Sequence, residues 1–273
     1  RHLIQKRNPE NLLPSAKSIL AVGLNYNQPN LHKSGVVRIA RYALGRDYHK
    51  VVRGKLKRIS AQLCQTYSKL EFRICVDSAP ILERDFAQLA GLGWYGKNTM
   101  LINSERGSWF VIGLLLLSEH FEPSKPAIGG CGSCKKCIEA CPTGAIVPIN
   151  GSWQIDARQC ISYRTIELKG EIAIESANPI ENWTFGCDIC QEVCPFNEAR
   201  PSQPLRASNT LEPDFTSRKP QKSLVDLCKM SREDWDVWTR GSPLRRAGYE
   251  GIRRNARLNL AAGQQESVEP PKG

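Results

Sequence analysis

Apolar and polar positions in the first half of the chain form blocks that predict strands and helices in turn. Ser18 to Tyr26 and Trp109 to Leu117 are apolar runs of strand length, and Phe72 to Val76 is a shorter one. Asp47 to Tyr67 carries apolar residues at roughly helical spacing, which predicts an amphipathic helix. A second helix is expected from Ile81 to Ala90. Strands that alternate with helices favour an α/β (α+β) domain over residues 1–125.

The pattern changes near residue 125. Pro123 to Gly130 has the composition of a linker, and residues 131–200 hold most of the cysteines. Leu224 to Trp238 predicts a helix, and a last helix opens with Ser242 as N-cap and Pro243 in its first turn. We therefore expect an α/β domain over 1–125, a cysteine-rich module over 126–200, a helical segment over 201–262 and a disordered tail over 263–273.

Eight of the eleven cysteines have the spacing of ligands for two 4Fe-4S clusters. The first run reads C-x2-C-x2-C-x3-C-P, and the second reads C-x2-C-x3-C-P with Thr184 where a complete run would have its first ligand. Cys160 is the simplest replacement for that missing ligand. In a ferredoxin-like module the last cysteine of each run ligates the other cluster. Cluster one then takes Cys131, Cys134, Cys137 and Cys194, and cluster two takes Cys141, Cys160, Cys187 and Cys190.

Two other uses of these cysteines fit the sequence less well. A disulfide framework suits small secreted chains rather than one of 273 residues. Zinc sites use paired C-x2-C motifs, and two C-x3-C-P endings fit zinc poorly. Cys64, Cys75 and Cys228 stand alone and are expected to be small buried side chains.

The net charge of +11 points to a polyanionic partner, with nucleic acid as the first candidate. The alternative is that the charge only aids solubility. The longest apolar run, Trp109 to Leu117, is too short to cross a bilayer, so we expect no membrane association and a cytoplasmic location. The chain starts at Arg1 in a basic, helix-like stretch, which suggests the interior of a longer protein.

Several segments together resemble one enzyme family. They are the strand end Val76 to Pro80, the turn Gly91 to Thr99, the two cysteine runs, Phe185 to Cys190, and Pro243 to Gly248. In this combination the sequence resembles epoxyqueuosine reductases from about Asn11 to Ala262. The resemblance implies a cobalamin-dependent enzyme that reduces epoxyqueuosine to queuosine at the wobble position of tRNA, the last step of queuosine synthesis. Two clusters would pass electrons from an external low-potential donor to cobalamin, in a monomer that lacks an N-terminal segment.

The resemblance also implies roles for single residues. Asp77 would be the general acid that protonates the leaving epoxide oxygen, provided that an apolar pocket raises its pKa. The alternative for Asp77 is a helix N-cap, and Gly91 can be read as an ordinary helix C-cap. His49 is read as a surface histidine rather than a cobalt ligand. The cobalamin contacts would come from Tyr42, Tyr48, Asp77, Lys97, Asn98, Ser162 and Asp188, although Asp188 can equally be a backbone acceptor in a tight turn.

Arginines are concentrated in the last predicted helix. They could bind tRNA phosphates, and the alternative is a solvated helix face. The five are Arg245, Arg246, Arg253, Arg254 and Arg257. Tyr163, Arg164 and Trp183 are candidates for stacking on splayed bases.

Two rival functions are also compatible with parts of the sequence. A reductive dehalogenase-like enzyme would use the same cofactors on a small molecule, and Asp77 and the arginine-rich helix count against it. A ferredoxin-type carrier would need no α/β domain ahead of its clusters. Cobalamin binding separates the carrier from both enzymes.

Overall fold

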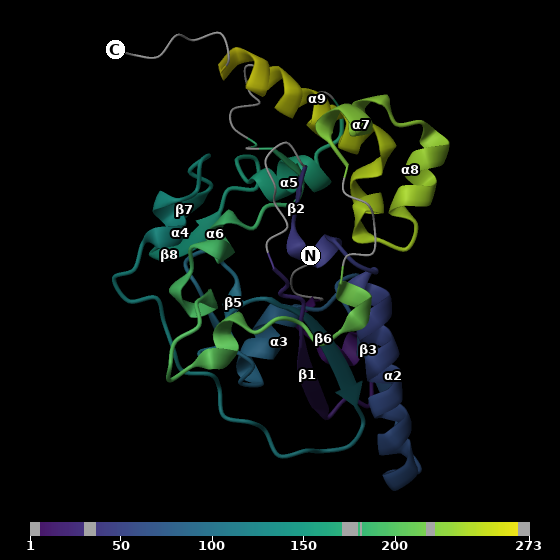
Figure 1. Cartoon of the computed structure of the whole chain (residues 1–273). Helices are drawn as coiled ribbons and strands as arrows, with labels where there is room; N and C mark the ends of the chain where they lie inside the picture. The colour runs from purple at the N-terminus through teal and green to yellow at the C-terminus, as the bar shows by residue number, and fades with distance from the viewer. Residues whose placement is uncertain (1–5, 30–36, 171–179, 181, 217–221, 267–273) are drawn as a thin grey trace. The chain divides into compact units, whose positions relative to one another are not determined.

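The structure, a computed structural model, describes residues 6–29, 37–170, 180, 182–216 and 222–266. It divides into two compact units, each assembled from segments that are separated in the sequence (Figure 1). The units are therefore not the consecutive segments that we expected. The first comprises Arg1–Asn27, Asp47–Cys134 and Pro195–Glu212, and the second comprises Gln28–Arg46, Lys135–Cys194 and Pro213–Gly273.

The first unit is built on a three-stranded sheet in the order β1-β6-β3. Its strands are β1 (Ser18–Asn25), β6 (Phe110–Leu117) and β3 (Phe72–Cys75), so the three predicted strands are confirmed. Both pairings are antiparallel, with Leu117 opposite Ser18 on one side and Phe72 on the other. The antiparallel sheet makes this unit α+β.

Helices cover both faces of this sheet. Alternate residues of β6 point to opposite faces: Leu115 and Leu117 share a core cluster with Leu56 of α2 (Tyr48–Thr66), while Leu114 and Leu116 pack on the other face. That second face also receives Phe86 of α3 (Glu83–Leu89). Each fully buried leucine contributes about 1.5–3 kcal/mol. Helices α2 and α3 confirm the two that we predicted, within two residues at each end.

Gly113 lets α2 approach the centre of the sheet. A Cβ at this position would lie 2.5 Å from Cγ1 of Val52 and 3.0 Å from Cδ1 of Leu56. The helix could then not keep its present distance from β6. The missing side chain of Gly113 therefore sets where α2, and the residues at its N-terminus, lie on the sheet.

The glycine-rich turn after α3 is a helix cap followed by a hairpin. Gly91 has φ of +79°, and the N–H groups of Gly91 and Leu92 donate to the carbonyls of Gln88 and Ala87, which is a Schellman motif. Strands β4 (Trp94–Tyr95) and β5 (Leu101–Ile102) then pair antiparallel. The C-cap reading of Gly91 is confirmed.

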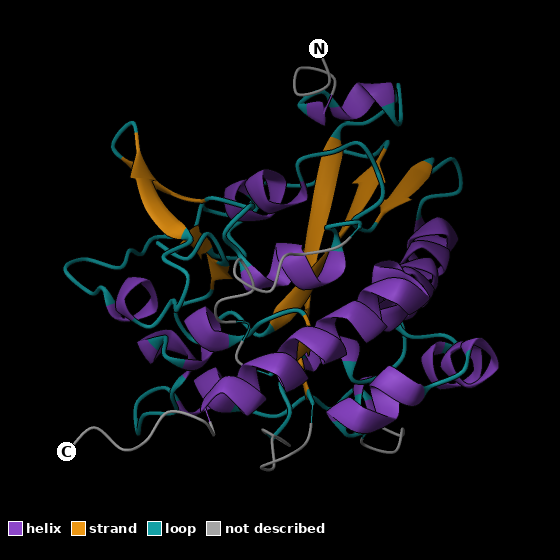
Figure 2. Cartoon of the chain, turned by 90° about the horizontal axis from the view of Figure 1, so that it is seen from above, coloured by secondary structure: helices purple, strands orange, loops and turns teal. Residues whose placement is uncertain are grey.

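The second unit carries small strands, short helices and six of the candidate cluster cysteines. Figure 2 shows the strands of the chain in orange and its helices in purple. Strand β2 (Arg38–Ile39) pairs in parallel with β9 (Trp183–Phe185). Strands β7 (Ile146–Ile149) and β8 (Ser152–Ile155) form a hairpin. The helices of this part are α4 (Lys136–Glu139), α5 (Ile161–Ile166) and α6 (Ile189–Glu192).

The C-terminal part of this unit is helical. The helix expected over 224–238 is two helices, α7 (Leu224–Lys229) and α8 (Arg232–Thr239), because Ser231 leaves the helical region and caps α8. Ser242 caps a 3-10 helix at Pro243–Ala247, as predicted. Helix α9 (Gly248–Glu266) follows, and its first residue, Gly248, has φ of +75°. The expected disordered tail is wrong for residues 263–266, which belong to α9, and residues 267–273 lie outside the described residues. None of the described helices combines the length and apolarity that crossing a bilayer requires.

Candidate active site and cluster ligands

The two cysteine runs have the same backbone. Helices α4 and α6 each span four residues, and their starts at Lys136 and Ile189 are 53 positions apart. The residues before them, Lys135 and Asp188, have similar dihedral angles (φ −125°, ψ 6° and φ −110°, ψ 0°). The same offset relates Cys137 to Cys190 and Cys141 to Cys194. This repetition is what two equivalent cluster-binding loops require.

All eleven cysteines lie in the described part of the chain, and each is a free thiol. In the second unit Cys160, Cys187 and Cys190 are close enough for their charges to interact, and Cys137 acts on Cys190 as well. Burial is the larger cause that raises the pKa of Cys187, to about 12, and it raises that of Cys190 further. Such buried thiolates need cations beside them, and cluster iron supplies these.

Thr184 occupies the position of the absent cysteine in the second run. Its side chain is fully buried in β9 between Trp183 and Phe185, while Cys160 lies just before α5 as that helix's N-cap residue. Cys160 thus lies near Cys187 and Cys190, and the division of the eight cysteines between two clusters stays a prediction. Within the described residues no three His, Cys, Asp or Glu side chains converge as ligands of a single metal ion.

Cys131 and Cys134 belong to the first unit, where Lys97 holds the loop between them. The Lys97 ammonium donates to the carbonyl oxygens of Gly132 (2.8 Å) and Cys134 (2.9 Å). Its backbone N–H donates to Sγ of Cys131 at 3.3 Å. Lys97 is therefore placed to support the first cysteine run.

Asp77 lies in a strained loop just after β3. Its φ is +56°, in the left-handed region, and the N–H of Ser78 donates to the carbonyl of Val76 at 2.6 Å. The N-cap reading of Asp77 is wrong, because α3 begins at Glu83 with Leu82 in the cap position. The expected apolar pocket is also wrong, because 64% of the Asp77 side chain is exposed. Backbone strain of this kind costs about 1–3 kcal/mol and is concentrated at functional sites.

His49 joins Asp77 to the start of α2. Its Nε2 lies 3.0 Å from Oδ2 of Asp77, and its Nδ1 lies 2.7 Å from Oδ1 of Asp47. Asp47 also caps α2 by accepting the His49 backbone N–H at 3.0 Å. The ring of Tyr48 stacks on the imidazole, with 4.1 Å between centroids. These contacts fix the histidine ring on both edges and on one face.

The two carboxylates around His49 change its charge state. Hydrogen bonds from Asp47 and then Asp77 raise the pKa of His49 from 6.5 to about 9, against partial burial. The imidazole is therefore protonated at neutral pH and donates from both nitrogens. Glu83 completes the group by accepting the backbone N–H of Asp77 at 2.5 Å. Burial raises the pKa of Glu83 to about 7, and the nearby Asp77 charge adds to the rise.

Two family models match separate parts of the chain. The 4Fe-4S double cluster binding domain matches residues 130–197, and the model described as epoxyqueuosine reductase QueG, DUF1730, matches residues 6–78. Among curated proteins, an Escherichia coli epoxyqueuosine reductase is 41% identical over 268 residues, which is 95% of this chain and 68% of that protein. A Synechococcus relative of the same name is 43% identical over 258 residues, 92% of this chain and 77% of the relative.

The chain belongs to the epoxyqueuosine reductase family. Solved structures of such reductases agree with this assignment. One that holds an epoxyqueuosine-modified tRNA-Tyr stem loop is 32% identical, has a TM-score of 0.81 and matches 98% of this chain and 73% of its own. One from Bacillus subtilis, with its catalytic aspartate loop swung out of the active site, is 30% identical with a TM-score of 0.83, covering 98% and 73%. The double-cluster match also shows that the chain has the 4Fe-4S domain of an iron-sulfur protein.

The residues expected to hold cobalamin in an epoxyqueuosine reductase fall into two groups here. Lys97, Asn98 and Asp188 already bond within the protein: Asn98 is 1% exposed and accepts the Met100 N–H. Asp188 is 3% exposed and accepts the Arg41 N–H at 2.8 Å. The Asp188 carboxylate therefore does accept a backbone N–H, but the donor is Arg41, 147 positions away in the sequence, and not a residue of its own turn. The half-buried candidates are Tyr42, Tyr48 and Ser162.

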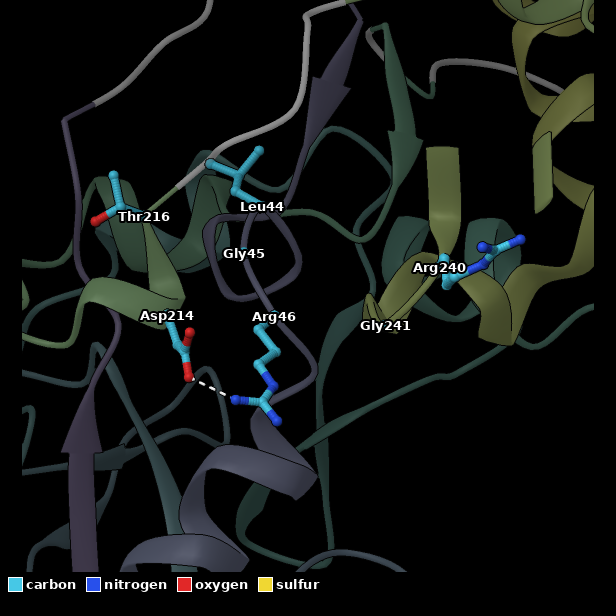
Figure 3. Close-up of a pocket in the computed structure, with 7 residues that line it drawn as sticks. All are labelled: Leu44, Gly45, Arg46, Asp214, Thr216, Arg240 and Gly241. Atoms are coloured by element: carbon cyan, nitrogen blue, oxygen red, sulfur yellow. Dashed lines mark hydrogen bonds and ion pairs between the residues drawn. The ribbon is translucent and has the colours of Figure 1, made fainter. Parts of the chain in front are cut away.

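A cavity of about 310 Å³ lies in the second unit, lined mainly by loops (Figure 3). Arg46 and Asp214 face one another across part of it and form an ion pair of 2.8 Å. A cavity of this size is at the lower end of the range for ligand pockets and cannot enclose a whole corrin. The lining residues are Leu44, Gly45, Arg46, Asp214, Thr216, Arg240 and Gly241.

The proposed tRNA-binding arginines are mostly engaged inside the protein. Arg254 is 4% exposed and donates to the carbonyls of Arg164, Leu168 and Gly170, so its assignment to tRNA is wrong. Arg253 donates to the Cys228 carbonyl.

The three exposed members of the set differ in their contacts. Arg245 pairs with Asp236, and Arg246 makes a fork-like pair with Glu167. Arg257 is exposed on α9. Of the residues expected to stack on tRNA bases, Arg164 and Trp183 are 7% and 0% exposed, so neither can stack on a base. Tyr163 is 40% exposed and stays a candidate.

Sequence reasoning missed the roles of Asp47, His49 and Glu83. The helical pattern puts Asp47 at the start of a helix and predicts His49 only as a surface side chain. A signal is present all the same, as an N-cap aspartate two residues before a histidine, which predicts that the cap and the imidazole share a carboxylate. The contact with Asp77 depends on how α2 packs against β3 and could not be read from spacing.

Proposed function

We propose that this chain reduces epoxyqueuosine to queuosine at the wobble position of tRNA, with electrons from two 4Fe-4S clusters and with cobalamin as the cofactor that meets the substrate. Membership in the family supports the reaction, and the relative with a modified tRNA-Tyr stem loop supports the substrate. The single structural observation that carries the proposal is the contact between His49 and Asp77. It places a charged proton donor behind an exposed carboxylate.

The reaction removes the epoxide oxygen as water and consumes two electrons and two protons. The Asp77 side chain is 64% exposed, and we propose that the proton it delivers comes from the imidazole that it contacts. His49 does hold one at neutral pH. A proton on Nε2 can pass to Oδ2 of Asp77 and from Asp77 to the leaving oxygen. Solvent then restores the proton of His49, and a second transfer along the same path completes the water. General acid catalysis of this kind contributes about 10² to 10⁴ in rate.

The residues around His49 and Asp77 hold these two side chains in the geometry that the proton relay between them needs. Asp47 accepts the second ring N–H, which fixes the tautomer and the orientation of His49. Glu83 accepts the Asp77 N–H and so holds the loop at its positive φ. Tyr48 covers one face of the imidazole and limits water there. Asp77 is therefore the catalytic residue of the proposal, and the other residues position it or supply its proton.

The residues of the chain fit the two kinds of cofactor to different degrees. Seven thiols in two repeated loops together with Cys160, with buried thiolates that need iron nearby, fit two clusters. Cobalamin, when bound, would supply a cobalt centre reducing enough to open an epoxide. Tyr42, Tyr48 and Ser162 are the half-buried side chains that we propose for its contacts, with Lys97 and Asn98 contributing through the loops that they hold. Asp188 would orient the loop between Cys187 and Cys190.

We also propose a cytoplasmic, monomeric enzyme that takes electrons from an external low-potential donor. The cytoplasm holds tRNA and keeps thiols reduced, and no described helix is suited to span a bilayer.

Turnover of tRNA containing epoxyqueuosine tests the relay. Asp77→Asn, with clusters and cobalamin loaded as in wild type, should lose nearly all activity because the amide cannot relay the proton. His49→Ala should lose about 10² or more, and added imidazole should restore part of it. Asp156→Asn, which removes an aspartate far along the chain from the relay, is the matched control. Full turnover by the Asp77 variant would remove Asp77 from the acid role.

A further inference from the structure

Helix α2 carries an exposed set of cations and no acid. Its 19 residues include Lys50, Arg53, Lys57 and Arg58 on the exposed surface, and no aspartate or glutamate anywhere. Lys50, Arg53 and Lys57 follow the i, i+3, i+7 spacing that puts them on one face of a helix. At 1.5 Å per residue the row from Lys50 to Arg58 is about 12 Å long. The opposite face, with Val52 and Leu56, packs on the sheet.

These four cations differ from several exposed arginines elsewhere in the chain. Within the described residues, none of the four makes an ion pair with a carboxylate. By contrast Arg158, Arg240 and Arg246 are 70–87% exposed and each pairs with an acid of its own surroundings. The fifth cation of α2, Lys55, also pairs, with Glu212. Four exposed cations thus lie together on α2 without a carboxylate partner among the described residues.

The arrangement costs the helix stability instead of adding to it. Like charges at i, i+3 and i, i+4 destabilise a helix by about 0.2–0.5 kcal/mol for each pair. A cation in the first turn, such as Lys50, opposes the helix dipole. A solvated face that served only solubility would do as well with mixed charges. The row therefore indicates a partner that supplies the negative charge.

The row of cations on α2 begins close to Asp77, the proposed catalytic residue. His49, whose ring contacts Asp77, immediately precedes Lys50. Arg53 is close enough to Cys75, two residues before Asp77, for its charge to lower the pKa of that thiol against burial. A polyanion with its reacting group at Asp77 would have its nearest backbone charges over this part of α2.

We propose that the exposed face of α2 binds backbone phosphates of the tRNA, on the part of the anticodon stem-loop adjacent to the modified nucleoside. This inference rests on the proposed function, since it takes epoxyqueuosine in tRNA as the substrate. It moves the main phosphate contact to α2 from the arginines of residues 245–257, among which Arg254 is buried and Arg245 and Arg246 pair with acids. Phosphate contacts position a nucleic acid without reading its sequence.

Phosphate neutralisation by lysine and arginine has a measurable salt dependence. The slope of log K against log salt falls by about 0.7–0.9 for each phosphate that is no longer neutralised. Removing Lys50, Arg53 and Lys57 should therefore make the slope shallower by about 2 to 3. At about 0.1 M salt the same substitutions should weaken binding roughly ten- to hundredfold.

The test measures binding of fluorescently labelled tRNA-Tyr to the full chain with its clusters loaded, by anisotropy over a range of potassium chloride concentrations. The variant is Lys50→Gln/Arg53→Gln/Lys57→Gln. The matched control is Arg106→Gln/Arg158→Gln/Arg240→Gln, which removes the same charge from exposed residues outside α2 that have no proposed role in tRNA binding. We expect the α2 variant to bind more weakly and with a shallower slope, as above, with a raised KM for tRNA and an almost unchanged kcat at saturation. The control should change the slope by less than about one unit.

Three outcomes would overturn the inference. The first is wild-type affinity and salt slope in the α2 variant, with an unfolding transition that matches wild type. The second is an equal weakening in both variants, which would show an effect of net charge alone. The third is unchanged tRNA binding with slower reduction by an acidic protein donor, which would assign α2 to that donor. If the wild-type chain binds the tRNA but does not reduce it, the proposed function fails while the α2 contact stands.

Discussion

The pKa of His49 reports most directly on the geometry around Asp77. The carboxylates of Asp47 and Asp77 raise it from 6.5 to about 9, so removing either should lower it. Asp47 should matter more, because its contact is shorter (2.7 Å against 3.0 Å) and its side chain is less exposed (24% against 64%). We expect the order wild type, then Asp77→Asn, then Asp47→Asn, from highest to lowest pKa.

The raised pKa also makes stability depend on pH. The folded protein binds the proton of His49 more tightly than the unfolded chain, so this stabilisation is fully present below pH 6.5 and is lost as the pH rises through about 9. A rise from 6.5 to about 9 corresponds to about 3 kcal/mol without screening. Because a third of the His49 side chain is exposed, solvent reduces this to about 1–2 kcal/mol.

Proton NMR of the imidazole ring measures this pKa directly. The titration would be run on the wild-type chain and on Asp47→Asn and Asp77→Asn, with His49→Gln to assign the signal. Asp156→Asn should leave the midpoint unchanged, because the ionic partner described for it is Arg158. A wild-type midpoint near the ordinary histidine value of about 6.5, or a midpoint that neither variant moves, would refute the reasoning about this site.

Three further predictions concern the clusters and the packing. Cys160→Ala should bind roughly half the wild-type iron, because one of two clusters loses a ligand; full iron content would contradict the ligand set. Arg254→Ala should lower the free energy of unfolding by about 2–5 kcal/mol, since three backbone carbonyls lose their charged donor, and a melting temperature equal to wild type would contradict its structural role. Gly113→Ala should cost about 1–3 kcal/mol through its clash with Val52, measured by urea denaturation, and an unchanged midpoint would show that α2 can shift freely.

Local pattern was sufficient for much of the fold. The apolar runs of β1, β3 and β6, the periodicity of α2 and the cap at Ser242 are properties of short segments, and the structure has them where the sequence predicts them. The cysteine runs are equally local, because ligand spacing is set by the loop itself. The direction of pairing in the sheet is not local, and the same strands are compatible with parallel or antiparallel pairing.

The missing parts of the site depend on tertiary contacts. Arg254 looks like any surface arginine in the sequence, and only the packing of α9 on α5 and β9 buries it. Asp77 resembles a helix cap until α3 is seen to begin later. The divided units arise because segments before and after the cysteine runs return to the same core, which no composition boundary reveals.

Nucleoside mass spectrometry tests the central claim most directly. The chain, loaded anaerobically with both clusters and cobalamin, is incubated with a low-potential reductant and tRNA from cells that accumulate epoxyqueuosine, and the tRNA is then digested. We predict that the modified nucleoside loses the mass of one oxygen atom, and that this change requires cobalamin. An unchanged nucleoside, from a sample verified to carry both clusters and cobalamin, would contradict the proposed reaction for this chain.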